Sequence, residues 1–388
     1  MTSSPTPASL GFRMPAEWHP HERTWMAFPT ANPTFDGAEQ LDAARRAWAE
    51  VANTLVRYEP VTLVANTGEG ADARRYLAPE VEIVERPLND AWMRDIGPSF
   101  LLGQNGELAA ADWVFNGWGA QSWARWDKDR DIAEHVTGLT GARRFASRLI
   151  NEGGGIHVDG EGTVLVTDTV QLGEGRNADW TREQVEAELH AHLGTTKAIW
   201  LPRGLTRDYD EFGTRGHIDI VAAFVRPGTV VVHSQPDPAH PDHLVCRELA
   251  DLLRTATDAR GRTLEVIELP APTVLFDEDG EPVDYSYINH YVANGTVLLC
   301  AFDDPRDEQA KAVLEKAYPD RTVELVDARE IFANGGGIHC ITQQQPRPDP
   351  GPSPPGGRRG RRGRPAGMMA WNSAPIVRRR TRWPSKPN

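Results

Sequence analysis

The sequence predicts an α/β fold made of repeated strand–strand–helix–strand modules. Along the chain, β-hairpin patterns alternate with amphipathic helical patterns, and the last three helices have centres about 60 residues apart. The string GGGIH also occurs twice, at 153–157 and at 335–339. Repeats of this length are typical of propeller-like modules around a central axis. A doubly wound sheet is disfavoured because hairpins interrupt the alternation of strands and helices.

The first half of the chain begins with an amphipathic helix and continues with strands and hairpins. A helix is predicted over 38–57 because apolar residues recur there every three or four positions, at Leu41, Ala44, Trp48, Val51 and Leu55. The other elements predicted in this half are strands at 61–66 and 81–87 with a short helix between them, a hairpin at 99–115 around Asn105-Gly106, a polar helix at 121–137 and a hairpin at 156–168 that turns at DGEG.

The second half repeats the same order of elements. The predicted elements are a helix at 181–193, strands at 217–225 and 229–233 joined through Pro227-Gly228, a helix at 240–256, a strand at 264–270, a hairpin that turns at Asn294-Gly295, a helix at 306–317 and a strand at 322–328. The repeated order supports one architecture for the whole body.

The composition is that of a soluble globular protein. The chain has 388 residues, of which 39% are apolar and 25% are charged. Its apolar runs, such as 219–226, are far shorter than the ~20 residues that a membrane helix needs. The N-terminus lacks the apolar stretch of a secretory signal. The three cysteines are isolated in sequence, which excludes a disulfide scaffold and a clustered thiolate zinc site. We therefore expect a cytoplasmic protein.

The formal net charge of −13 divides unevenly along the chain. Residues 347–388 carry 11 Lys and Arg and one Asp, which leaves 31 basic and 54 acidic residues in 1–346. The acidic body disfavours nucleic acid as a partner and favours cationic ligands, although the charge also has a plain role in solubility.

Three parts are expected: a flexible N-terminus at 1–13, a single folded domain at 14–346 and a disordered basic tail at 347–388. Of the tail's 42 residues, 15 are Pro or Gly, and the tail shows no hydrophobic period. Its RRGRRGR string is the one feature of the chain suited to contact nucleic acid, and a passive extension is the alternative interpretation.

Four segments are richer in Gly, polar and aromatic residues than their surroundings. They are NDAWMRDIGPSF (89–100), NEGGGIHVDG (151–160), GTRGHIDIV (213–221) and NGGGIHCITQQQP (334–346). Each adjoins a predicted strand, where a loop can direct side chains into a central cavity.

The cysteines differ in their surroundings. Cys246 lies on the apolar side of a predicted helix and Cys300 lies inside an apolar strand, so both are interpreted as packing residues. Cys340 follows three glycines and a histidine and precedes ITQQQ. Glycines allow close approach of a ligand and offer N–H groups that favour a thiolate. Cys340 is therefore a candidate nucleophile, or else a small residue at a tight strand end.

A histidine and several carboxylates accompany this cysteine. If GHID is part of a strand, His217 and Asp219 point to the same side, as an acid/base pair, half of a metal site or a surface pair. Asp90 and Asp95 flank Trp92, and one of the two carboxylates is interpreted as turn-forming. Glu152 precedes the first triple glycine, either as a functional carboxylate or as a cap on loop N–H groups.

One thiolate, one histidine and several carboxylates suit a positively charged substrate. Carboxylates oppose the oxyanion of papain-type acyl transfer. They are suited to a planar guanidinium, which two carboxylates hold by paired hydrogen bonds while a thiolate attacks its carbon. This chemistry requires no metal.

The motifs of the chain resemble those of the agmatine deiminase family, among the guanidino-group-modifying enzymes that include bacterial-type peptidylarginine deiminases. The matching segments occur in family order over about 14–346: MPAEWHPHERTWMAFP, NDAWMRDIGP, FNGWG, NEGGG, the GTRGHID block and GGGIHCITQQQP. The resemblance implies a five-bladed α/β-propeller, called a pentein, as a single catalytic domain. The tail at 347–388 has no counterpart in the family.

The resemblance also implies an activity and the residues that carry it. The activity is hydrolysis of agmatine to N-carbamoylputrescine and ammonia, a step towards putrescine, without a cofactor. Cys340 matches the family's nucleophile, His217 its general acid/base, and Glu152 the acidic residue beside the histidine. The substrate-binding residues implied are Asp95, Asp219 and Trp92. Relatives also suggest a homo-oligomer.

Three other interpretations remain open at this point. Deimination of free or peptidyl arginine uses the same core residues and differs at the far end of the substrate. A non-catalytic binding protein for cationic amines uses the carboxylates and has no need of a thiol. A metal hydrolase uses His217, Asp219 and His157.

Overall fold

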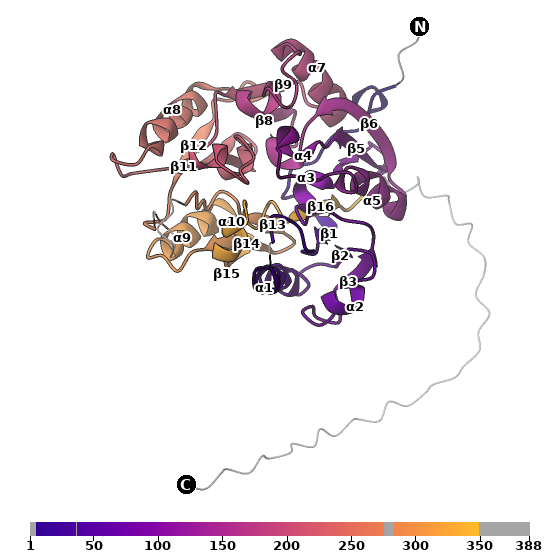
Figure 1. Cartoon of the computed structure of the whole chain (residues 1–388). Coiled ribbons are helices and arrows are strands. Elements are labelled where there is room, and N and C mark those ends of the chain that lie inside the picture. The colour runs from indigo at the N-terminus through magenta and orange to yellow at the C-terminus, as the bar shows by residue number, and fades with distance from the viewer. Residues whose placement is uncertain (1–4, 36, 275, 277–282, 349–388) are drawn as a thin grey trace, which may run out of the picture. The chain divides into compact units, whose positions relative to one another are not determined.

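The computed structural model describes residues 5–35, 37–274, 276 and 283–348. These residues contain five small β-sheets, which follow one another around a centre (Figure 1). The long helices lie outside this ring of sheets (Figure 1). The five sheets confirm the propeller-like architecture that the repeated modules predict.

Four sheets follow one plan. Their strand orders are β4-β5-β6 (Ser99–Leu102, Leu108–Val114, Arg143–Ile150), β7-β8-β9 (His157–Val158, Thr163–Thr167, Lys197–Leu201), β10-β11-β12 (Ala222–Arg226, Thr229–Ser234, Glu265–Pro270) and β13-β14-β15 (Tyr291–Ala293, Thr296–Ala301, Thr322–Asp327). In each, the first two strands form an antiparallel hairpin, and the second and third are parallel. A parallel pair needs a crossover, and a helix supplies it.

In chain order the crossover helices are α5 (Ile132–Thr140), α7 (Arg182–Leu193), α8 (Asp242–Thr255) and α9 (Asp307–Ala317). Three of these four helices, α7, α8 and α9, lie close to their predicted positions, whereas α5 does not. Helix α7 begins with a capping box, in which the Thr181 side chain accepts from the Gln184 N–H and the Gln184 side chain accepts from the Thr181 N–H. This local signal explains why the start of α7 was predictable.

The fifth sheet joins the two ends of the folded body. Its strand order is β16-β1-β2-β3 (Thr342–Pro346, His21–Ala27, Val61–Ala65, Glu82–Glu85), with β16 antiparallel to β1 and β1 parallel to β2. Helix α1 (Ala38–Leu55) makes the crossover, and four of the five residues of its predicted apolar face are buried. The fifth, Leu41, is partly buried and packs against the same core. The module therefore recurs, with its first strand supplied by the far end of the chain.

The remaining helical elements are short. They are η1 (Ala8–Leu10), α2 (Gly70–Ala73), α3 (Met93–Ile96), α4 (Gly117–Ala120), η2 (Asp129–Asp131), η3 (Gly153–Gly155), α6 (Asp168–Gln171), η4 (Arg207–Tyr209), η5 (Ile218–Ile220) and α10 (Arg329–Ala333). Several of them carry the candidate site residues.

The prediction of a helix over 121–137 is wrong in its first half. Helix α5 begins only at Ile132. Two contacts hold the preceding loop: Trp123 stacks on Trp118 with ring centroids 5.3 Å apart, and the Asp129 carboxylate accepts the N–H groups of Asn89 and Asp90, about 40 positions earlier in the chain, at 2.6 and 3.0 Å. These contacts favour the loop over a continued helix.

The sequence-based prediction also missed four strands, β1, β6, β9 and β16.

The prediction of a strand over 217–225 is also wrong at its start, because β10 begins at Ala222. Residues Ile218–Ile220 form the 3₁₀ turn η5. The N–H groups of Thr214, Gly216 and His217 point to the buried carboxylate of Asp208, which folds this segment into a loop.

The ends of the described chain are also held by contacts. Phe12 is buried, and Arg13 pairs with Leu102, so part of the predicted N-terminal segment packs on the body. Arg347 donates its N–H to the carbonyl of Pro20 at 2.7 Å. Most of the predicted tail, 349–388, lies outside the described residues. No helix within the described parts of the chain is both long enough and apolar enough to span a bilayer.

Candidate active site

The structure brings together the candidate residues of all four segments. Asp95 lies on α3, Glu152 directly precedes η3, and His217 and Asp219 lie at and within η5. Cys340 lies two residues before β16. All five side chains are at most 5% exposed. A thiol, an imidazole and three carboxylates therefore share one buried site.

Glu152 and His217 form a pair that Arg176 supports. Oε2 of Glu152 lies 3.3 Å from Nε2 of His217, and Nε of Arg176 lies 3.0 Å from both Glu152 oxygens. Arg176 also donates to the carbonyl of Thr214 at 2.8 Å. Burial raises the pKa of the Glu152 carboxyl, but the Arg176 and His217 charges outweigh it and the pKa is lowered. Glu152 is thus an ionised partner for the imidazole.

His217 is surrounded by negative charge. Its Nδ1 lies 3.9 Å from Oδ1 of Asp95 and has no hydrogen-bond partner among the described residues. Burial lowers the pKa of His217, but Asp95, Glu152 and Asp219 outweigh this effect and raise it to about 9. The imidazole is therefore protonated at neutral pH and can act as a general acid.

Asp95 is held by two donors from different parts of the chain. Oδ2 accepts the indole N–H of Trp118 at 2.8 Å, and Oδ1 accepts the N–H of Gly154 at 3.0 Å. A Cβ at position 154 would lie 2.4 Å from Nδ1 of His217 and 2.9 Å from Oδ1 of Asp95. Only glycine fits at this position, which explains part of the first triple glycine. Burial raises the pKa of Asp95.

Asp219 lies beside the thiol. Its Oδ2 is 3.6 Å from Sγ of Cys340 and 2.8 Å from Nδ1 of His339, while its Oδ1 is buried with no partner among the described residues. Burial raises the pKa of the Asp219 carboxyl, but the hydrogen bond and charge of His339 outweigh it and the pKa is lowered. Asp219 is thus a carboxylate with one oxygen held and the other available to a cation.

Cys340 sits in a setting that disfavours the thiolate. Burial and the nearby Asp219 and Asp95 carboxylates raise the pKa of the thiol well above its ordinary value. Asn289 contacts this residue: its Nδ2 lies 3.3 Å from Sγ, and its Oδ1 accepts the N–H of His339 at 3.0 Å and of Cys340 at 3.4 Å. In the absence of a bound cationic substrate, this setting favours the neutral thiol of Cys340.

The Trp92 indole and the Cys340 thiol both lie close to Gly336, in the second triple glycine. A Cβ at Gly336 would lie 2.9 Å from both Sγ of Cys340 and Cζ3 of Trp92. Trp92 is 4% exposed and packs edge-on against Trp48 with ring centroids 5.3 Å apart. Its indole therefore borders the site, where the resemblance places it.

The two other cysteines and Asp90 lie apart from this chemistry. Cys246 is buried on α8 and Cys300 in β14, and burial raises the pKa of each thiol to about 12. Asp90 accepts the Thr34 hydroxyl at 3.0 Å and the Ala91 N–H at 2.8 Å, as a turn-forming carboxylate does.

His217 and Asp219 do not share a face by strand alternation, since they lie on the loop and turn before β10. The turn nevertheless leaves both side chains in the site.

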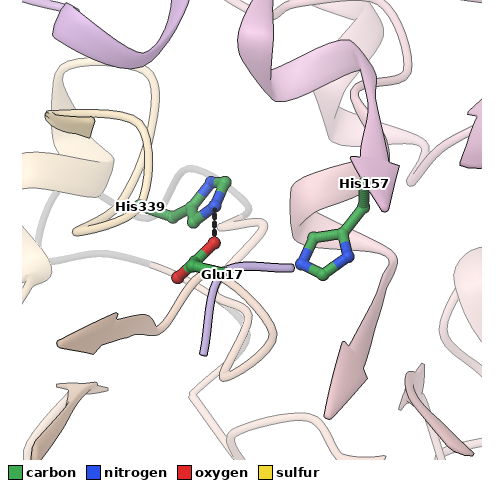
Figure 2. Close-up of side chains that lie close together, drawn as sticks. All are labelled: Glu17, His157 and His339. Atoms are coloured by element: carbon green, nitrogen blue, oxygen red, sulfur yellow. Dashed lines mark hydrogen bonds and ion pairs between the residues drawn. The ribbon is translucent and has the colours of Figure 1, made fainter. Parts of the chain in front are cut away.

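Among the described residues, one cluster is compact enough to hold a metal. It consists of Glu17, His157 and His339, whose potential ligand atoms all lie within 4.8 Å of one another (Figure 2). The predicted set of His157, His217 and Asp219 does not form such a cluster.

The close approach of Glu17, His157 and His339 is explained by the hydrogen bonds that their side chains already make. Nε2 of His339 lies 2.8 Å from Glu17 and Nδ1 lies 2.8 Å from Asp219, so both ring nitrogens serve carboxylates. Burial lowers the pKa of His157 to about 3, and its Nδ1 accepts the Phe224 N–H at 3.2 Å, which places the ring proton on Nε2. Neither histidine therefore presents the free lone pair that a metal needs.

Sequence reasoning missed several residues of the site. Trp118, Arg176, Asn289, His339 and Glu17 all contact a candidate residue or its partner. Trp118, His339 and Glu17 belong to motifs that the sequence did single out, FNGWG, GGGIH and MPAEW. Arg176 and Asn289 have no comparable local signal.

The chain is similar to known proteins in both sequence and structure. The family model described as Porphyromonas-type peptidyl-arginine deiminase matches residues 13–346. A Streptomyces avermitilis protein named "Putative agmatine deiminase" is 66% identical over 344 residues, which is 88% of this chain and 99% of the relative. The agmatine deiminase of Pseudomonas fluorescens is 38% identical over an alignment of 366 positions that covers 88% of this chain and 98% of the relative.

Solved structures support the same relationship. A structure of the agmatine deiminase of Enterococcus faecalis superposes with a TM-score of 0.83 and 32% identity, over 90% of this chain and 99% of the other. The five sheets of this chain fit the pentein propeller. The chain belongs to the Porphyromonas-type peptidyl-arginine deiminase family.

Proposed function

We propose that this chain hydrolyses agmatine to N-carbamoylputrescine and ammonia, a step towards putrescine, through a covalent amidino-thioether on Cys340. One observation carries the proposal: the Cys340 thiol lies 3.6 Å from Asp219, whose other oxygen is available, in a site that also contains Asp95 and a protonated His217. The names of relatives 66% and 38% identical to this chain support agmatine as the substrate.

Substrate binding supplies the missing positive charge. Two or three buried carboxylates near one thiol repel each other, and a guanidinium between Asp95 and Asp219 neutralises them. Its planar N–H groups match Oδ1 of Asp219, which has no partner among the described residues. Trp92 borders the same space and contributes an apolar wall for the methylene chain.

The bound cation also activates the nucleophile. The carboxylates that raise the pKa of Cys340 are neutralised by the guanidinium, so the thiol releases its proton to solvent only when substrate is bound. The thiolate then forms a bond to the central guanidinium carbon. The resulting tetrahedral adduct is neutral, because the thiolate and the guanidinium charges cancel.

His217 carries the proton for the leaving group. Its imidazolium donates a proton to one amino group of the adduct, the C–N bond breaks, and ammonia departs to leave the cationic amidino-thioether. The neutral imidazole then takes a proton from water, and the hydroxide formed attacks the same carbon. Collapse of the second adduct breaks the C–S bond, forms the C=O bond and returns the carbinol proton to Cys340. The net reaction consumes one guanidinium and one water and gives a ureido product and ammonium.

We also propose that the protein acts in the cytoplasm as a homo-oligomer, with a single catalytic domain over 14–346. Three free, buried cysteines support a reducing compartment. Light scattering of the purified chain measures the oligomeric state, and a monomer overturns that part of the proposal.

The experiment that tests the function compares ammonia release from agmatine, free arginine and an arginine-containing peptide. Cys340→Ser is the inactive variant and Cys246→Ser the matched control, because Cys246 is also buried but lies on α8. Turnover of agmatine that is lost in the first variant and kept in the second supports the proposal. Activity only on arginine or the peptide moves the substrate assignment to those compounds. If no compound is turned over but Cys340→Ser binds agmatine, the protein is a binding protein.

A further inference from the structure

A buried chain of three charged side chains leads away from the site. Oε2 of Glu17 lies 2.8 Å from Nε2 of His339, and Nδ1 of the same ring lies 2.8 Å from Oδ2 of Asp219. Figure 2 shows the Glu17 carboxylate directed at the His339 ring. All three residues are at most 5% exposed. Glu17 precedes β1, so the start of the folded body reaches a residue of the candidate active site.

The ring between the two carboxylates is an imidazolium. A neutral imidazole has one N–H group, whereas both ring nitrogens of His339 face carboxylate acceptors. Burial and the Arg94 charge lower the pKa of His339, but Glu17 and Asp219 outweigh them and raise it. Glu17 therefore keeps a positive charge beside Asp219.

This arrangement has a consequence for both oxygens of Asp219. The bond from His339 fixes Oδ2, which leaves Oδ1 directed away from the ring and without a partner among the described residues. The positive charge of the ring also keeps the carboxylate ionised despite its burial. A guanidinium requires both properties: a fixed acceptor direction and a negative charge.

Glu17 is itself anchored. Its Oε1 accepts the Val292 N–H at 2.8 Å, and Oε2 lies 3.9 Å from Nη2 of Arg94. Burial raises the pKa of Glu17, but His339 and Arg94 outweigh it and lower it strongly. The other charged or titratable groups that face His339 or Asp219 among the described residues are His157, His290, His217, Asp95, Cys300 and Cys340.

We propose that Glu17 and His339 are positioning residues for the deimination, which hold Asp219 ionised and oriented to receive the guanidinium. This inference rests on the proposed function. Neither residue needs to touch the substrate, since both act through Asp219. One residue from each of the motifs MPAEW, GHID and GGGIHC thus belongs to the arrangement that receives the guanidinium.

The test is the pH dependence of kcat/KM for agmatine in Glu17→Gln. The amide of this variant can still accept the Val292 N–H, but it lacks the negative charge that keeps the His339 ring protonated. We expect kcat/KM at pH 8 to fall about tenfold, and the acidic limb to move up by at least one pH unit because the pKa of Asp219 rises. The basic limb, set by His217, should stay in place.

Glu59→Gln is the matched control. Glu59 is a second buried carboxylate paired with a histidine, with its Oε1 3.0 Å from Nδ1 of His21. The described residues show no direct hydrogen bond or ion pair between Glu59 and Asp219, and the His21 ring reaches Glu17 only at its backbone carbonyl, at 2.7 Å. The kcat/KM of Glu59→Gln should change less than about twofold, with both limbs unmoved. An equal loss at every pH in Glu17→Gln, or the same limb shift in Glu59→Gln, overturns the inference.

A double-mutant cycle tests the route through Asp219. In an Asp219→Asn background, Glu17→Gln should lower kcat/KM by less than about threefold further, because the carboxylate that it serves is gone. If the losses of kcat/KM caused by the two substitutions multiply in the double variant, the inference is overturned. His339→Asn provides a second variant, since its amide can still donate to Asp219, and it should retain at least tenfold more activity than His339→Ala. Equal activities of these two variants also contradict the proposal.

The outcome for the wild-type chain separates the two proposals. If wild type does not turn over agmatine, the proposed function fails, and the same profiles are measured with arginine or the peptide, whichever is consumed. If wild type turns over agmatine and Glu17→Gln has the wild-type profile, only the positioning role fails.

Discussion

Nε2 of His217 lies 3.3 Å from Oε2 of Glu152, although 65 positions separate the two residues in the chain. One residue comes from the loop before β10 and the other from the loop after β6. The pair exists because the loops of successive sheets meet at the centre of the ring, and together with Asp95 and Asp219 it raises the pKa of the imidazole. The predictions below concern this pair and its neighbours.

The carboxylates of Asp95 and Asp219 should each be needed for turnover. Replacing either with Asn removes half the countercharge of a buried guanidinium, which costs about 3–5 kcal/mol, roughly a 10²–10³-fold or greater loss of kcat/KM. Steady-state kinetics with agmatine measures the loss. Asp258→Asn, a buried carboxylate that serves the Arg260 and Arg262 N–H groups, is the control. A loss below tenfold for both site variants means that neither holds the substrate.

The basic limb of the activity profile should report His217. Its pKa is raised to about 9, so the imidazole is protonated below that pH and loses its proton above it. The general acid is then absent, and kcat/KM should fall as the pH rises through about 9. In Glu152→Gln the supporting charge is removed, the pKa falls and the limb moves to lower pH. Glu188→Gln, which alters a carboxylate 3.6 Å from His192, should leave the limb in place. An unmoved limb in Glu152→Gln assigns it to another group.

The free enzyme should react slowly with iodoacetamide at pH 7. The thiolate is the reactive form, and burial with the Asp219 and Asp95 charges raises the pKa of Cys340 well above its usual range. Inactivation should therefore accelerate with pH. Asp219→Asn removes one of the opposing charges, lowers the pKa and should speed inactivation at pH 7 while it slows turnover. Mass spectrometry of the labelled peptide identifies the site. Faster labelling of wild type than of this variant contradicts a neutral resting thiol.

Gly154 should be required because its neighbours leave no room for a larger side chain. A Cβ there would overlap Nδ1 of His217 and crowd Asp95, so Gly154→Ala should lower kcat/KM at least 100-fold. Gly138 is the control, because it lies exposed in α5 and a Cβ there meets nothing within 4 Å. Gly138→Ala should keep full activity and stabilise the fold by about 0.5–1 kcal/mol. Calorimetry and kinetics measure both effects, and an active Gly154→Ala shows that His217 can move.

The chain's local patterns were sufficient for much of this description. The helical periodicity at α1, the Asn-Gly turns and the repeated GGGIH string predicted the modules, because each depends on residues a few positions apart. The same reasoning placed helix 121–137 too early and began a strand at His217. In the first case the Asp129 carboxylate holds the N–H groups of Asn89 and Asp90, about 40 positions earlier in the chain, and in the second the Asp208 carboxylate holds the N–H of Gly216. These contacts replaced the regular local structure.

By itself the sequence determined the repeated module, the family of its motifs and the residue types that the chemistry requires. Only the tertiary structure decided which of these residues meet. Strand β16 pairs with β1 across the two ends of the folded body, which brings Glu17 to His339 and closes the ring around Cys340. Arg176 and Asn289 were likewise found only in the fold. The reason is physical: periodicity depends on neighbouring residues, whereas these contacts join positions tens to hundreds of residues apart, and only the packing of complete sheets brings them together.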